Sequence, residues 1–135
     1  MENEKGTYGF GCVVEVGFDE AVTRVRAALK SEGFGVLSEI NVSKALHDKL
    51  GVDFRKYVIL GACNPPLAHR ALSTDLEVGL LLPCNVVVYE NTPSSSSVRV
   101  MDPNAALGIV PGDALRPIAA EARERLLRVV VALRV

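Results

Sequence analysis

The chain has 135 residues and a formal net charge of -1 at pH 7, so its length favours one domain and its charge excludes a strongly basic surface. Basic and acidic side chains are balanced in both halves, which argues against nucleic-acid binding and against a polybasic membrane anchor. No apolar run reaches the length of a membrane-spanning helix, and the polar first residues do not form a signal peptide. We therefore expect a cytoplasmic protein, with residues 1–7 as a disordered leader and residues 8–135 as a single domain.

The predicted elements begin with a strand over residues 8–16, where apolar side chains recur at every second position. A helix follows, with Asp19 as its N-cap and Gly33 at its C-terminal end. Further along, the sequence predicts a strand over 34–40, a short helix over 41–50 and a strand over 55–62.

The next helix is expected to start at a strand-to-helix junction. Asn64 suits its N-cap, and Pro65 suits its first position because the N–H of that position has no partner within the helix. The longest apolar run, 78–90, is interrupted by Pro83. Because proline cannot donate to a sheet ladder, it requires an edge, a strand start or a bulge, and we expect a bulge just before Cys84.

A hairpin and a final helix complete the chain. Residues 91–97 predict a turn, and residues 98–101 predict a strand that pairs back. Residues 102–113 form an irregular segment that is long enough to be a lid. Asp113 is expected to cap the last helix, whose apolar stripe faces the core. This order predicts an α+β fold with a mostly antiparallel sheet and two main helices packed on one face.

Several strings of this sequence together resemble a known family. They are GFGVL at 33–37, KLGVD at 49–53, ACNP at 62–65, LLPCNVVVY at 81–89 and DP at 102–103. From about residue 8 to residue 133, the chain is similar to a bacterial and archaeal family labelled domain of unknown function number 302. The resemblance implies a TATA-binding-protein-like β-α-β4-α fold and a homodimer, and it implies no established activity. Sharing this fold does not imply DNA binding, because function resides in sites rather than in folds.

Two Cys-Asn steps, each beside a proline, are the candidates for chemistry. The first is Cys63-Asn64 before Pro65, and the second is Cys84-Asn85. A helix N-terminus favours the thiolate form of a neighbouring cysteine, and its free N–H groups favour a bound anion. We hypothesise a paired-thiol site for redox, sulfur or soft-metal chemistry, with Cys63 as the reactive thiol and Cys84 as the resolving or co-ligating partner. Asn64, Pro65 and Asn85 are the candidate ligand-binding residues.

A metal site would draw on Cys63, Cys84 and His69, which give one ligand fewer than a structural zinc site needs and the three that a catalytic zinc site with a bound water needs. His69 lies about one turn into its helix, so its ring need not face the thiols. The three cysteines, among them Cys12 in the first strand, show no CxxC spacing, and we expect no disulfide framework. The sequence points to no particular cofactor. Buried free cysteines are also common as small core residues, which is the alternative for both Cys-Asn steps.

Two further functions stay open, and the sequence does not decide whether the protein is an enzyme. A small-molecule binding module would hold its ligand between the sheet and the last helix, with the 102–113 segment as a lid. A structural homodimer would pair through a strand edge or through the last helix. In that helix, Val129, Val130 and Val131 place apolar side chains on more than one side.

Overall fold

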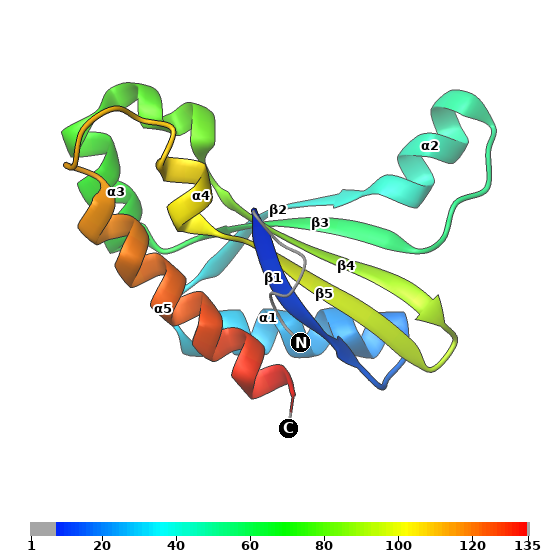
Figure 1. Cartoon of the computed structure of the whole chain (residues 1–135). Coiled ribbons are helices and arrows are strands. Elements are labelled where there is room, and N and C mark those ends of the chain that lie inside the picture. Colours follow the sequence, from blue (N-terminus) through cyan, green and yellow to red (C-terminus); the bar gives the residue numbers. More distant parts are fainter. Residues whose placement is uncertain (1–7, 135) are drawn as a thin grey trace.

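The computed structural model describes residues 8–134, in which helices alternate with the strands of one sheet (Figure 1). The strands are β1 (Gly9–Val14), β2 (Gly35–Asn41), β3 (Tyr57–Cys63), β4 (Cys84–Thr92) and β5 (Ser95–Met101). The helices are α1 (Phe18–Ser31), α2 (Val42–Leu50), α3 (Pro65–Thr74), the 3-10 helix η1 (Leu76–Leu81), α4 (Pro103–Leu107) and α5 (Arg116–Leu133). The expected leader, residues 1–7, lies outside the described residues.

The sheet has the strand order β1-β5-β4-β3-β2, and each neighbouring pair is antiparallel. The two long helices, α1 and α5, pack on one face of it (Figure 1). Since successive side chains of a strand point to opposite faces, side chains at alternate positions, such as Phe10, Leu60 and Val88, are fully buried under these helices, whereas β2 has no buried residue. The α+β prediction with two main helices on one face is therefore confirmed. The likeness to TATA-binding protein stays a prediction.

A second, smaller core lies at one end of the sheet, where α3, η1 and α4 gather beside α5 (Figure 1). Its buried side chains include Leu67, Val78, Leu107 and Ile118. The chain runs from β3 into α3 and from η1 into β4. The small core therefore adjoins the main core where β3 ends and β4 begins.

The bulge expected before Cys84 is absent, and that prediction is wrong. β4 begins at Cys84, directly after Pro83, so the proline stands just outside the strand and needs no ladder hydrogen bond. The pairing of β2 with β3 does shift register, between Val36 and Ser38. The structure thus places a bulge beside the Cys-Asn steps, in β2, where no sequence pattern predicted one.

The start of the last helix also differs from the prediction. α5 begins at Arg116, and its N-cap, Leu115, makes no side-chain cap hydrogen bond. Asp113 does not cap the helix and forms an exposed ion pair with Arg116 at 3.1 Å. The predicted irregular segment contains α4, whose N-cap Asp102 accepts a hydrogen bond from the Asn104 N–H at 2.9 Å.

α2 stands apart from the other helices at the far end of β2 and β3 (Figure 1). Asn41 caps its start by accepting a hydrogen bond from the Lys44 N–H at 3.0 Å, and Gly51 ends it with a φ of 69°. The helix contacts β3 and has no buried residue. Across residues 8–134, no helix combines the length and the apolar character that crossing a membrane requires.

Candidate functional site

The two Cys-Asn steps come together where the small core adjoins the main core. β3 ends at Cys63, and the neighbouring strand β4 begins at Cys84. Cys84 pairs with Ala62 in the ladder, so the two cysteines are offset by one residue across adjacent strands. Both are free thiols and both are partly exposed. The strand order, which the sequence left open, therefore brings the two thiols to one site.

An apolar cavity of about 300 Å³ lies at this site, and both thiols line it. The other lining residues come from β2, β3, β5, α3, η1, α4 and α5 and from the segments beside them. None of these side chains is charged, and one carries an amide. The lining residues are Phe34, Leu37, Ala62, Cys63, Asn64, Leu67, Ala68, Ala71, Leu72, Gly79, Leu81, Leu82, Pro83, Cys84, Met101, Pro103, Leu107, Ile118 and Ala122.

Helical spacing explains part of the apolar wall. Leu67 and Ala71 are four residues apart on α3, and Ile118 and Ala122 are four apart on α5, so each pair lies on one face of its helix. The 102–113 segment contributes Pro103 and Leu107 through α4. The cavity therefore lies between the end of the sheet and the last helix, and part of the 102–113 segment forms one of its walls.

Asn64 is the one amide in the wall, and both of its polar groups have partners within the fold. Its Oδ1 accepts a hydrogen bond from the Leu67 N–H at 3.2 Å, which confirms the predicted N-cap. Its Nδ2 donates to the Glu32 carbonyl oxygen at 3.4 Å and so ties the start of α3 to the end of α1. With only 8% of its surface exposed, Asn64 acts mainly as a bridge between two helices.

The N-terminus of α3 does not offer the free N–H groups that were expected beside Cys63. Pro65 and Pro66 carry no N–H, and the Leu67 N–H is held by Asn64. The Ala68 N–H donates to the Asn64 carbonyl oxygen at 2.9 Å, as the first hydrogen bond of the helix. An anion or a thiolate at this helix end would therefore find the positive helix dipole but no hydrogen-bond donor from the backbone of the first turn.

Cys84 is a neutral thiol at physiological pH. Burial, first, and the nearby thiol of Cys63, second, raise the pKa of Cys84 to about 11. Removal of water disfavours the charged form of an acid, and a second thiolate close by would add repulsion. The side chain of Cys84 therefore extends the uncharged character of the cavity wall.

The remaining candidate site residues lie outside the cavity wall. Pro65, His69 and Asn85 are all exposed, and Asn85 pairs with Gly61 in the ladder between β3 and β4. For residues 8–134, no group of three or more His, Cys, Asp or Glu side chains is placed to hold a metal ion. Of the six candidate residues, the cavity wall thus contains Cys63, Cys84 and Asn64 and does not contain the three exposed ones.

Sequence reasoning missed two wall residues that come from strands. Leu37 stands at the register shift of β2, and Met101 ends β5. No local pattern marks either residue, because segments that are far apart in the chain form the wall. The signals that the sequence did offer were the two Cys-Asn steps, the last helix and the 102–113 segment, all of which contribute to the wall.

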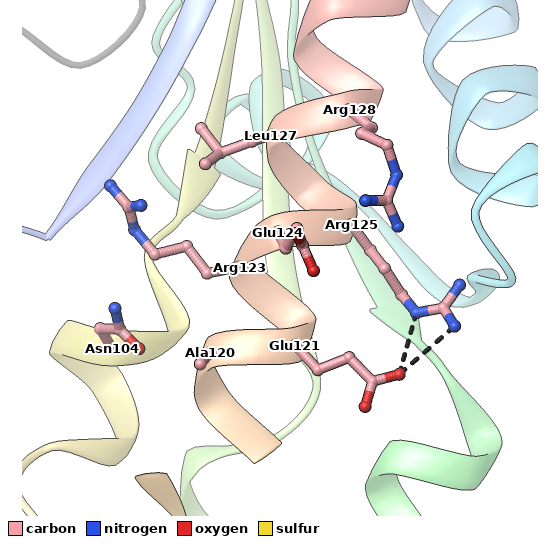
Figure 2. Close-up of a pocket in the computed structure, with 8 residues that line it drawn as sticks. All are labelled: Asn104, Ala120, Glu121, Arg123, Glu124, Arg125, Leu127 and Arg128. Carbon is pink, nitrogen blue, oxygen red and sulfur yellow. Dashed lines mark hydrogen bonds and ion pairs between the residues drawn. The ribbon is translucent and has the colours of Figure 1, made fainter. Parts of the chain in front are cut away.

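A second depression, of about 690 Å³, lies on the outer side of α5 and is lined mainly by charged residues of that helix (Figure 2). Figure 2 shows Arg125 directed at the carboxylate of Glu121. Because its arginines have acidic partners, this groove carries no excess positive charge for an anion. Arg123, Arg125 and Arg128 pair with Asp102, Glu121 and Glu32, at 3.2, 3.3 and 2.9 Å respectively.

Comparison with known proteins agrees with the resemblance found in the Cys-Asn strings. Residues 10–133 match the family described as domain of unknown function DUF302. The chain is also similar to a solved structure, the crystal structure of an uncharacterized conserved DUF302 protein from Bacillus stearothermophilus. The two share 37% sequence identity and superpose with a TM-score of 0.86, over 96% of this chain and 100% of that chain. No curated protein matches this chain.

Proposed function

This chain belongs to the DUF302 family, and from its cavity we propose that it binds a compact, uncharged, apolar small molecule. The observation that carries the proposal is the wall itself, which holds two thiols, one amide with partners and no charged side chain. Its volume of about 300 Å³ is at the lower end of the roughly 300–1,000 Å³ of ligand pockets. Ligand sites of this kind are mostly apolar with a few polar groups, and this one suits a ligand of up to three rings or a short branched chain.

The apolar wall favours an apolar occupant. Water gains little in such a site, because it needs two to four polar partners and this wall offers few. An apolar ligand gains dispersion contacts with the wall.

Two related fluorescent probes test the proposal. N-phenyl-1-naphthylamine is uncharged and brightens in apolar surroundings, and 1-anilinonaphthalene-8-sulfonate has the same skeleton with an added sulfonate. We expect saturable binding of the uncharged probe at one site. The sulfonated probe should bind at least about tenfold more weakly, because the wall has no partner for a buried charge.

A matched pair of variants locates the binding. Ala68 lines the cavity, whereas Ala27 is exposed on α1 outside it. Ala68→Phe should remove binding of the uncharged probe and Ala27→Phe should leave it unchanged, with circular dichroism showing both variants folded. Equal binding of both probes, or binding that survives Ala68→Phe in full, would overturn the proposal.

Paired-thiol chemistry is a second candidate, favoured by the presence of Cys63 and Cys84 in one wall. The offset of one residue between them and the neutral state of Cys84 make it the weaker one. Alkylation of the native protein by iodoacetamide at pH 7.5, read at each cysteine by mass spectrometry, separates the two candidates. Fast modification of Cys63 supports thiol chemistry, and modification only after unfolding removes it.

The thiol state of the cysteines also fits a cytoplasmic location, because the cytoplasm is a reducing compartment.

Homodimer formation is a separate proposal, which the resemblance implied. Val129 and Val130 are buried in the core of the chain itself, so α5 offers only Val131 as an exposed valine. The better surface is the segment around α2, where Leu50 and Phe54 are 69% and 47% exposed. Sedimentation should show a dimer that Leu50→Glu dissociates, whereas a monomeric parent protein would remove the proposal.

A further inference from the structure

The cavity wall has one exposed side chain, and it belongs to Leu37. Among the lining residues, Leu37 and Gly79 are exposed, and all the others are buried or partly buried. Gly79 contributes no side chain. Leu37 is 71% exposed and still borders the cavity, so its side chain lies where the cavity meets solvent.

The bulge of β2 explains why a leucine occupies this position. Val36 pairs with Ala62 and packs against the main core, and Glu39 pairs with Leu60 and forms an ion pair with Arg26 of α1. Both side chains thus lie on the helix-covered face of the sheet. They are three residues apart, and in a regular strand residues at an odd spacing point to opposite faces. The register shift between Val36 and Ser38 absorbs the extra residue, which is Leu37.

Bulges of this kind re-aim a side chain and often occur beside functional sites. The strand itself is an edge strand, so Leu37 has a neighbouring strand on one side only. Its side chain is also 71% exposed, so most of its surface faces solvent rather than packed neighbours. The residue combines two properties of a gate, contact with the cavity and room to change rotamer.

We infer that Leu37 is the residue at the mouth of the cavity that sets the rate of ligand passage and the size of ligand admitted. This inference rests on the proposed ligand-binding function and assigns a role within it. An exposed side chain adds little contact area to the bound state. It obstructs ligand on the way in and on the way out equally, so it affects both rates more than the affinity.

Stopped-flow fluorescence tests the inference with N-phenyl-1-naphthylamine and the smaller, uncharged 1-naphthylamine. For the larger probe, Leu37→Ala should raise both the association and the dissociation rate constants by about fivefold or more, with Kd changed by less than about twofold. The effect should be smaller for the compact probe, which needs less space to pass. Leu37→Trp should slow the larger probe.

Ile40→Ala is the matched control, because Ile40 is an exposed apolar residue of the same strand, 51% exposed, and does not line the cavity. It should leave both rate constants unchanged. If the probes bind and the Leu37 variants leave their rates at the parent values, or if Ile40→Ala has the same effect, the gate is refuted and ligand binding stands. If neither probe binds the parent protein, the proposed function itself fails.

Discussion

Asn64 shows at the scale of one residue how the fold constrains the site. Its side chain caps α3 and reaches the end of α1, where the Glu32 carbonyl oxygen also accepts a hydrogen bond from Arg125 of α5 at 3.3 Å. The amide therefore takes part in a junction of three helices beside the cavity. Asn64, which the sequence suggested as a ligand-binding residue, therefore holds the cavity wall in place.

Replacing Asn64 should cost stability. Asn64→Ala removes a buried cap and leaves the Leu67 N–H without its partner, so the free energy of unfolding should fall by about 1–3 kcal/mol in urea titrations. The control is Asn85→Ala, at an exposed position, where the change should stay within about 0.5 kcal/mol. Equal effects of the two substitutions would contradict the bridging role.

The pKa of Cys84 has a consequence for stability at high pH. The unfolded thiol has a pKa of 9.0 and the folded one a pKa of about 11, so between these values the unfolded chain loses its proton first. The unfolded state then binds fewer protons, and stability falls as pH rises. The stabilisation is complete below pH 9 and is lost by about pH 11.

Unfolding measured from pH 8 to pH 11 should show this loss. It should reach up to about 2–3 kcal/mol, because the pKa of Cys84 differs by about 2 between the folded and unfolded states and a difference of 1 corresponds to about 1.36 kcal/mol. Tyrosines titrate in the same range, so the readout is the difference between the parent protein and Cys84→Ala. That difference should shrink as pH rises. A constant difference across the range would show that Cys84 ionises as an ordinary thiol.

At the scale of elements, the turn from α1 into β2 places Gly33 against the cavity wall. Gly33 has a φ of 84°, a left-handed conformation that disfavours other residues, and a Cβ there would lie 3.0 Å from Asn64 Nδ2. Gly33→Ala should therefore lower the free energy of unfolding by about 1–2 kcal/mol. Gly35→Ala should leave the free energy of unfolding unchanged, because a Cβ at this position meets nothing within 4 Å and Gly35 has no positive φ. Calorimetry of both variants makes the comparison. Destabilisation of similar size in both variants would contradict this account.

Local rules predicted some element ends correctly, but the N-caps predicted at Asp19 and Asp113 are wrong, because α1 begins after Gly17 and α5 begins after Leu115. The cap at Asn64 followed from residue type and from the proline after it, and the C-terminal glycine of α1 followed in the same way. The bulge at Leu37 could not be predicted, because it depends on what Val36 and Glu39 contact in other elements. The turn predicted over residues 91–97 extends too far. Ser96 belongs to β5, because its pairing with β4 overrides its local turn propensity.

At the scale of the whole molecule, the cavity exists because the chain builds two cores. One is formed by the sheet with α1 and α5, and the other by α3, η1, α4 and the start of α5. Because α5 belongs to both, the two cores are held together along one helix while a space stays open at the ends of β3 and β4. The sequence suggested a pocket between the sheet and the last helix, but the second core depends on contacts between distant segments and could not be predicted.

The most direct test of this account is a crystal of the protein soaked in iodobenzene, with the iodine located by its anomalous scattering. The account predicts the strongest iodine peak inside the cavity, in contact with Cys84 and the apolar face of α3. Apolar cavities take up such ligands because no water competes for the site. A main peak in the charged groove of α5 (Figure 2), or no peak inside the cavity, would contradict the claim that this protein binds apolar small molecules there.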